Sequence, residues 1–176
     1  MAITGNDVYI TNNSNKHVFV IDAQSDAVID SVDVGGKNDE IFYLNGKMVV
    51  MRNADIDNEM KAAFATINPS NKQVESVVEY PATATVWDAK ATLYNNKVYF
   101  LHENSVMYLE NGAVNELFKY EGISAYNIAI FDDLIYITDA KDYSSTGAVL
   151  QYNMQGELLN TYATGIIPTA IMRYEK

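Results

Sequence analysis

The chain has 176 residues, of which 48% are hydrophobic and 20% charged, enough for one globular domain with a sizeable buried core. Its 23 acidic and 12 basic residues give a net charge of −11, which argues against nucleic acid and anionic membranes as partners. The absence of cysteine excludes a disulfide framework and thiolate chemistry. No apolar run reaches the roughly 18 residues of a membrane helix. The start, Met1–Asp7, lacks the basic and apolar segments of a signal peptide.

An apolar hairpin recurs four times along the chain. Each hairpin has two apolar strands and a two-residue turn of Gly, Asn or Asp, residue types that tolerate the positive φ angles of tight turns. The four hairpins cover residues 2–11, 42–51, 92–101 and 129–138. Their equivalent positions Tyr9, Val49, Tyr99 and Tyr136 are 40, 50 and 37 residues apart. This spacing is close to the ~40–50 residues of a propeller blade.

Two further strands follow each hairpin. The third strands are expected at 17–23, 62–68, 105–110 and 148–154, and the fourth at 28–34, 74–80, 114–120 and 158–164. Residues 28–34 alternate apolar and polar, as expected for an outer strand with one wet face. The first strand of each unit is the most apolar, which fits a strand lining a central channel.

The pattern predicts an all-β protein, a β-propeller of about four blades, each a four-stranded antiparallel sheet. The blades are expected at 1–36, 37–81, 82–122 and 123–165, followed by a closing strand at 166–176. The chain thus begins inside a first-type strand, 1–4, and ends on another, 169–174.

Closure of the propeller has three solutions. The last strand could pair with residues 8–11 and close a small four-bladed ring. Two chains could join through their open edges into a homodimer with a larger ring. The chain could also be the C-terminal part of a longer, seven-bladed propeller. Each solution removes exposed strand edges that would otherwise pair with other chains.

The first blade resembles the YVTN, or surface-layer-type, propeller repeat. The resemblance rests on Val8-Tyr-Ile-Thr-Asn12, His17-Val-Phe-Val-Ile-Asp22 and Ala27-Val-Ile-Asp-Ser-Val-Asp-Val-Gly35. The last unit, 141–168, looks like the C-terminal blade of related propellers in gut Bacteroidetes. This resemblance implies a propeller fold and an extracytoplasmic location, in the periplasm or at the cell surface. Some of those relatives are surface lipoproteins that capture corrinoids, but this sequence lacks the lipidated N-terminal Cys that they carry.

Function in a propeller usually lies on one rim, formed by the loops between blades and between the second and third strands. In this chain those loops carry aromatic and polar side chains, which suit a flat organic ligand or a sugar. The candidate ligand-binding residues are Asp39, Arg52, Trp87, Asp88, His102, Tyr126, Asn127 and Tyr143. The alternative for Trp87 and Tyr126 is packing between blades, and for Arg52 a solvated loop.

Catalysis and resident metals are not expected. The two histidines, His17 and His102, fall in different blades, and no Gly-x-Ser-x-Gly elbow is present. Two rim carboxylates could lie at a glycosidase separation, but no spacing favours them. The acidic loop at 53–59 is only a partial match to a Ca²⁺ loop, and a solvated loop is the stronger interpretation.

The sequence therefore predicts a non-catalytic binding or scaffold module of the cell envelope, with no cofactor. Its rim would present a site for a small ligand, a glycan or a protein, with a corrinoid as the ligand that the family resemblance implies. A propeller hydrolase or lyase that uses rim carboxylates is the alternative.

Overall fold

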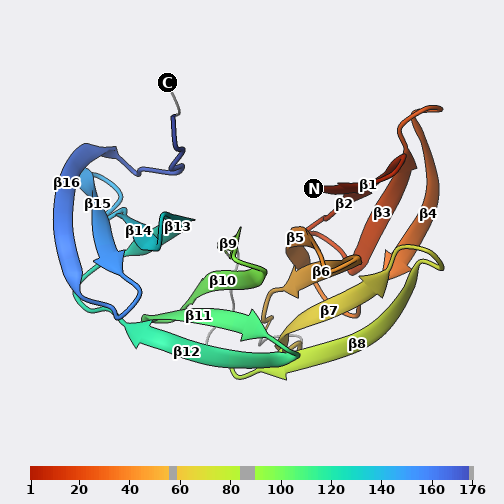
Figure 1. Ribbon diagram of the computed structural model, residues 1–176, viewed down its shortest axis with the longest axis horizontal. Helices are drawn as coiled ribbons and strands as arrows, with labels where there is room; N and C mark the ends of the chain where they lie inside the picture. The colour runs from red at the N-terminus through yellow and green to blue at the C-terminus, as the bar shows by residue number, and fades with distance from the viewer. Residues whose placement is uncertain (56–58, 84–89, 175–176) are drawn as a thin grey trace. The chain divides into compact units, whose positions relative to one another are not determined.

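The computed structural model describes residues 1–55, 59–83 and 90–174. These residues form four four-stranded antiparallel sheets, and no helix occurs among them. In every sheet the strands are neighbours in chain order, as Figure 1 shows. The fold is the predicted all-β propeller architecture with four blades. The described part of the chain has no helix long and apolar enough to cross a membrane.

The chain divides into two compact units, Met1–Ala89 and Lys90–Lys176, each with two sheets. The strands of the first unit are β1 (Ala2–Thr4), β2 (Asp7–Ile10), β3 (His17–Asp22), β4 (Ala27–Asp33), β5 (Asn38–Leu44), β6 (Lys47–Arg52), β7 (Ala62–Asn68) and β8 (Gln73–Tyr80). Those of the second unit are β9 (Ala91–Tyr94), β10 (Lys97–His102), β11 (Ser105–Glu110), β12 (Ala113–Lys119), β13 (Ala125–Phe131), β14 (Leu134–Asp139), β15 (Thr146–Asn153) and β16 (Leu158–Ile166). The four sheets span residues 2–33, 38–80, 91–119 and 125–166.

The predicted hairpin turns form where Gly, Asn and Asp pairs stand. Positive φ angles occur at Gly5, Asn45, Gly46, Asn95, Asn96, Asp132 and Asp133. Gly, Asn and Asp adopt a positive φ at a small cost in conformational free energy. Turns of this kind also match the right-handed twist of the paired strands. Local chemistry therefore fixes the register of the first two strands in each sheet.

Burial varies with the position of a strand in its sheet. The fourth strands β4, β8 and β16 are mostly exposed, as predicted for outer strands, whereas β12 is exposed at three of its seven residues. The most buried strands, however, are second and third strands such as β6 and β7, whereas first strands such as β1 and β9 are half-buried. A second or third strand has a hydrogen-bonded neighbour on each edge, so less of its backbone is exposed than in a strand at the edge of the sheet.

Each unit has its own hydrophobic core between its two sheets. In the first unit, Tyr9, Val18 and Val20 of one sheet share a core with Met48, Val50, Ala65 and Ile67 of the other. In the second unit the core includes Tyr99, Val106 and Phe118 from the first sheet and Ile128, Ile130, Ile135, Ile137, Leu150 and Tyr152 from the second. At about 1.5–3 kcal/mol per fully buried large side chain, these cores dominate the stability of each unit.

The C-terminal segment has no strand assigned between residues 167 and 174, where the sequence predicts a closing strand. Side chains of β13 and its hairpin turn hold this segment instead. Asn127 Nδ2 donates a hydrogen bond to the carbonyl oxygen of Thr169 at 2.6 Å. Arg173 pairs with Asp132 at 2.8 Å.

Candidate functional site

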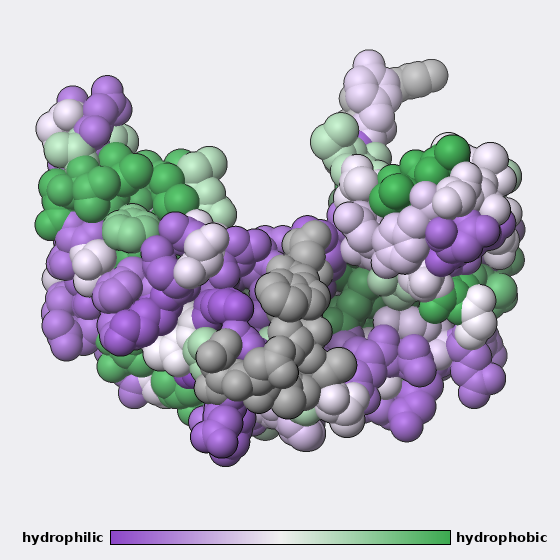
Figure 2. Space-filling model, turned by 180° about the vertical axis from the view of Figure 1, so that it is seen from behind, coloured by the Kyte–Doolittle hydropathy of each residue, from purple (hydrophilic) through white to green (hydrophobic). Residues whose placement is uncertain are grey.

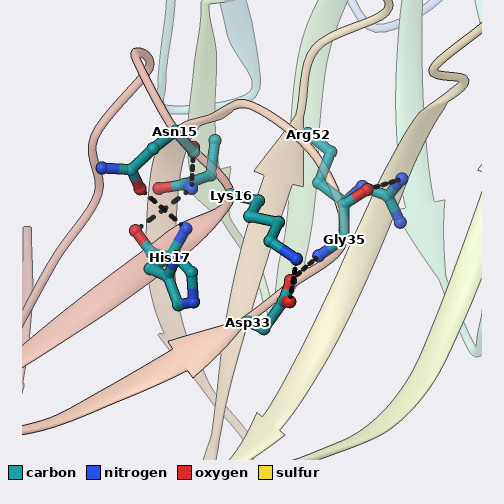
Figure 3. Close-up of polar contacts among 7 residues, drawn as sticks. Asn15, Lys16, His17, Asp33, Gly35 and Arg52 are labelled. Carbon is teal, nitrogen blue, oxygen red and sulfur yellow. Dashed lines mark hydrogen bonds and ion pairs between the residues drawn. The ribbon is translucent and has the colours of Figure 1, made fainter.

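The connection from β4 to β5 brings the two sheets of the first unit together at their edge. Asp33, the last residue of β4, accepts a hydrogen bond from the backbone N–H of Gly35 at 2.8 Å and pairs with Lys16 at 2.6 Å. The hydrogen bond from Lys16 lowers the pKa of Asp33. Figure 3 shows this cluster, with Arg52 on the other side of Gly35. The connection is thus held from both sides.

Arg52 ends β6, and the residue is only 8% exposed. Its Nη2 donates to the carbonyl oxygen of Gly35 at 2.9 Å. The guanidinium lies so close to Gly36 that an added Cβ there would be 2.8 Å from Nε, which is why glycine stands at this position. Burial lowers the pKa of Arg52, opposed by the charges of Glu79 and Asp33. Arg52 therefore lies within the fold and supports the connection between sheets.

The guanidinium is not fully satisfied. Its Nε is a buried donor with no hydrogen-bond partner among the described residues. No carboxylate in that part of the chain forms an ion pair with Arg52. An unpaired buried donor costs roughly 1–3 kcal/mol of folding free energy, so the unpaired Nε of Arg52 destabilises this edge slightly.

Asn38 is a structural residue that the sequence reasoning missed. It is fully buried at the start of β5, where its Oδ1 accepts from the Asn12 N–H at 2.8 Å. Its Nδ2 donates to the carbonyl oxygens of Asn15 and His17 at 3.1 and 3.3 Å. One amide thus satisfies three backbone groups of the β2–β3 loop. A buried Asn inside a polar run, Lys37–Glu40, has no distinguishing signal in the sequence.

Asp39 belongs to a polar chain beside Arg52. It accepts from Asn53 Nδ2 at 3.3 Å, and the Asn53 backbone N–H donates to the carbonyl oxygen of Lys37 at 2.9 Å. Lys37 in turn pairs with the buried Asp55 at 2.6 Å. These contacts engage the carboxylates of Asp39 and Asp55 within the protein.

A hollow of about 500 Å³ opens beside this chain of polar contacts, within the first unit. It is lined by Ala54, Glu59, Met60, Lys61, Glu79, Tyr80, Pro81 and Ala82. The lining comes from the β6–β7 connection and from the end of β8 with the start of the following connection, two of the loop classes predicted to form the functional rim. The sequence candidates did not include these lining residues.

The hollow has an apolar wall and a charged border. Tyr80 is buried and its ring lies 5.7 Å from that of Phe64, and this burial raises the pKa of Tyr80. Lys61 pairs with Glu79 at 2.7 Å, and that hydrogen bond lowers the pKa of Glu79. An apolar wall with a few fixed charges is the usual composition of small-molecule sites, whose volumes run from roughly 300 to 1,000 Å³.

In the second unit, the structure brings Tyr126 and Tyr143 together. Their rings meet edge to face, with centroids 6.0 Å apart and an interplanar angle of 78°. Tyr143 is exposed, has a φ of 62°, and donates its backbone N–H to the carbonyl oxygen of Ala140 at 2.9 Å. Asn127 is occupied by Thr169, as described above. The tyrosine pair is therefore an accessible aromatic surface of this unit.

His102, a predicted ligand-binding residue, belongs to the first sheet of the second unit. It ends β10 opposite Ser105, and its ring is 6.4 Å from that of Phe100.

Asp139 is buried and accepts from the N–H groups of Ser124 and Lys141, both at 2.9 Å.

Two acidic loops, the one at 53–59 and the one that contains Asp142, have carboxylates engaged by other groups of the protein. Asp142 accepts from the N–H groups of Ser144 and Ser145, and these bonds lower its pKa to about 2. Asp55 is paired with Lys37, while Asp57 lies outside the described residues. Within residues 1–55, 59–83 and 90–174, no group of three or more acidic or histidine side chains could hold a metal ion.

The predicted site residues thus fall into separate groups. Asp39 and Arg52 belong to the first unit, and His102, Tyr126, Asn127 and Tyr143 to the second. Trp87 and Asp88 lie outside the described residues.

Comparison with known proteins supports the fold. No protein-family model matches the chain, and no curated protein matches it. Among solved structures, the hydrazine synthase of Kuenenia stuttgartiensis is 13% identical with a TM-score of 0.67, over 93% of this chain and 48% of that one. The dihydro-heme d1 dehydrogenase NirN, in complex with DHE, is 10% identical with a TM-score of 0.62, over 91% of this chain and 36% of that one.

A protein of unknown function from Bacteroides caccae is also similar, at 13% identity and a TM-score of 0.61, over 94% of this chain and 60% of that one. The similar structures are β-propeller proteins, and at these identities the likeness shows the fold alone. The chain spans between about a third and two thirds of the length of these three structures.

Proposed function

We propose that this chain is a non-catalytic propeller module that binds a small organic ligand in the hollow beside Tyr80. The observation that carries the proposal is the hollow itself, with its volume of about 500 Å³ and its apolar wall. Ala54, Met60, Tyr80 and Pro81 supply apolar contact, while Lys61 and Glu79 supply charge at the border. A flat ligand with one polar or charged edge suits this arrangement.

Two observations favour binding over hydrolysis. Asp22, Asp33, Glu75, Glu79 and Asp142 have lowered pKa values because each accepts hydrogen bonds. A glycosidase needs one carboxyl group whose pKa is raised so that it can act as an acid. In addition, His17 and His102 stand on different sheets, β3 and β10. We therefore assign no catalytic residue.

The family resemblance extends this proposal to an extracytoplasmic module of the cell envelope. On that basis a corrinoid and a glycan are the ligand classes to test beside small aromatic acids. The exposed Tyr126–Tyr143 pair of the second unit is a further aromatic surface on which a sugar could stack.

Methionine methyl NMR tests the site directly, because the chain has seven methionines and Met60 lines the hollow. We would titrate protein labelled at the methionine methyl groups with cyanocobalamin, with an oligosaccharide mixture and with an aromatic carboxylic acid. A ligand in the hollow is expected to shift the Met60 signal, assigned with Met60→Leu, and to leave that of the exposed Met172 unchanged.

The same experiment can reject the site. Binding that moves the Met172 or Met107 signal and leaves Met60 unmoved would place the ligand elsewhere. If none of the three ligand classes perturbs Met60 at millimolar concentration, the hollow is not a site for them.

A further inference from the structure

The hollow beside Tyr80 has three charged side chains in its lining. They are Glu59, Lys61 and Glu79, which are two carboxylates and one ammonium group. Lys61 pairs with Glu79 at 2.7 Å, and the positive charge of the buried Arg52 also acts on Glu79. The negative charge of Glu79 is therefore compensated by groups of the protein itself.

Glu59 differs from Glu79, because no residue in the described part of the chain forms an ion pair with it. The residue is exposed and has a φ of 56°. Two backbone hydrogen bonds between Asp55 and Met60, at 2.8 and 2.9 Å, fix the backbone that directly follows it. One uncompensated carboxylate thus stands at the border of the hollow.

A ligand that fills the hollow would remove water from this carboxylate. Burying an ionised carboxylate is costly unless a hydrogen-bond donor or an opposite charge replaces the water. An ammonium group supplies both, because it carries a positive charge and N–H donors. The apolar part of the lining, which includes Met60 and Tyr80, is available to the uncharged body of the same ligand. An aromatic ring such as that of Tyr80 also attracts a cation placed over its face.

The net charge of the first unit also favours a cation over an anion. Met1–Ala89 contains 13 acidic and 6 basic residues, which give a formal charge of −7. Figure 2 shows hydrophilic side chains, drawn in purple, below an apolar patch in the left part of the view, where the first unit lies. A surface with an excess of one charge attracts ions of the opposite sign and repels ions of its own sign. An anionic ligand would be repelled both by this excess and by Glu59.

We propose that the ligand of the hollow is an organic cation, whose ammonium group pairs with Glu59 and whose apolar body lies against Met60 and Tyr80. This inference rests on the proposed function, because it names the chemical class of the small molecule that the hollow binds. Among ligands with the same apolar body, an amine therefore binds more tightly than an alcohol or a carboxylic acid.

Three probes that share a phenylethyl group test this order: phenethylamine, phenethyl alcohol and hydrocinnamate, which are cationic, neutral and anionic at neutral pH. Each is titrated at low salt into protein labelled at the methionine methyl groups, and the shift of the Met60 signal gives its Kd. We expect the amine to bind about threefold more tightly than the alcohol and about tenfold more tightly than the acid. The factors are modest because the ion pair is partly exposed to water.

Two variants test the role of the charges in the lining. Glu59→Gln should weaken the binding of phenethylamine to about that of phenethyl alcohol. Lys61→Gln leaves Glu79 without its ion pair, so it should tighten the binding of phenethylamine about twofold to threefold. The matched control is Asp26→Asn, which removes one negative charge from the exposed turn between β3 and β4, outside the lining of the hollow. It should leave the preference for the amine unchanged.

The outcomes separate this inference from the proposed function. If the alcohol or the acid shifts the Met60 signal with a Kd equal to or lower than that of the amine, the hollow is a binding site but not one for cations. A preference for the amine that survives Glu59→Gln, or that is lost in Lys61→Gln, would also overturn the inference. If none of the three probes moves the Met60 signal at millimolar concentration, both the inference and the assignment of the hollow as a small-molecule site are wrong.

Discussion

The close approach of Arg52 to Gly36 gives a residue-level test of the connection between the first two sheets. In Gly36→Ala the new Cβ would lie 2.8 Å from Nε of Arg52, which is too close for two non-bonded atoms. The buried guanidinium can move away only by losing its hydrogen bond to the carbonyl oxygen of Gly35. We expect a loss of about 1–3 kcal/mol in the free energy of unfolding, measured by urea denaturation. Gly165→Ala is the control, because nothing lies within 4 Å of its added Cβ.

The effects of substituting Gly36 and Arg52 on the free energy of unfolding are expected to be non-additive. In Arg52→Ala the clash is absent, so Gly36→Ala should cost clearly less in that background than in the wild type. Equal costs in both backgrounds would show that the strain at Gly36 does not come from Arg52.

Asp142 predicts a defined pH dependence. Hydrogen bonds from the N–H groups of Ser145 and Ser144 lower its pKa from 3.8 to about 2 in the folded protein. Its contribution to stability is therefore fully present above pH 3.8 and is lost as the pH falls toward 2. Asp142→Asn should be less stable than the wild type at pH 6, and the difference should shrink toward zero near pH 2. Urea midpoints measured from pH 6 to pH 2 give the result, and a difference that stays constant would contradict the assignment.

At the scale of the element, the hairpin turns set how the strands pair. Asn96 has a φ of 58° in the turn between β9 and β10, a conformation that costs a β-branched residue roughly 1–2 kcal/mol. Asn96→Val should lower the free energy of unfolding by about that amount, whereas Asn96→Gly should be neutral or stabilising. Chemical denaturation compares the three proteins, and equal stabilities would mean that the turn is not held in this conformation.

The repeated hairpins made the strands predictable from the sequence, but the sequence did not predict how deeply each strand is buried. A two-residue turn of Asn, Asp or Gly between apolar strands specifies a hairpin locally, so the predicted strands at 42–51 and 92–101 form where expected. The first strands, expected from their apolar sequence to line a central channel, are only half-buried in β1 and β9. β6 has strand neighbours on both sides, whereas β1 is hydrogen-bonded to a strand on one side within its sheet.

At the scale of the whole molecule, charge predicts how stability responds to salt. A net charge of −11 opposes compaction by self-repulsion, which salt screens over a Debye length of roughly 10 Å at 0.1 M. Raising the salt from about 20 to 200 mM at pH 7 should therefore raise the urea midpoint. The control is the same measurement near pH 4.4, the isoelectric point of the sequence, where the increase should disappear. An equal increase at both pH values would point to a salt effect other than screening.

The candidate site shows where prediction from the sequence ends. The loops expected to form a rim do line the hollow, yet its walls are Met60, Tyr80 and Pro81, and none of these stood among the predicted residues. Arg52, a predicted ligand residue, is instead buried against Gly36. A rim loop can be recognised from its position within the four-strand repeat. Which of its side chains face the hollow depends on how the two sheets pack.

The sequence by itself determined the four hairpins, their turns and the blade order, because strand alternation and turn chemistry act between residues close in the chain. The tertiary structure decided which strands are buried, that Asn38 and Arg52 bind the connections of the first unit, and that a hollow opens beside Tyr80. Those outcomes depend on contacts between residues far apart in sequence, whose geometry no local pattern encodes.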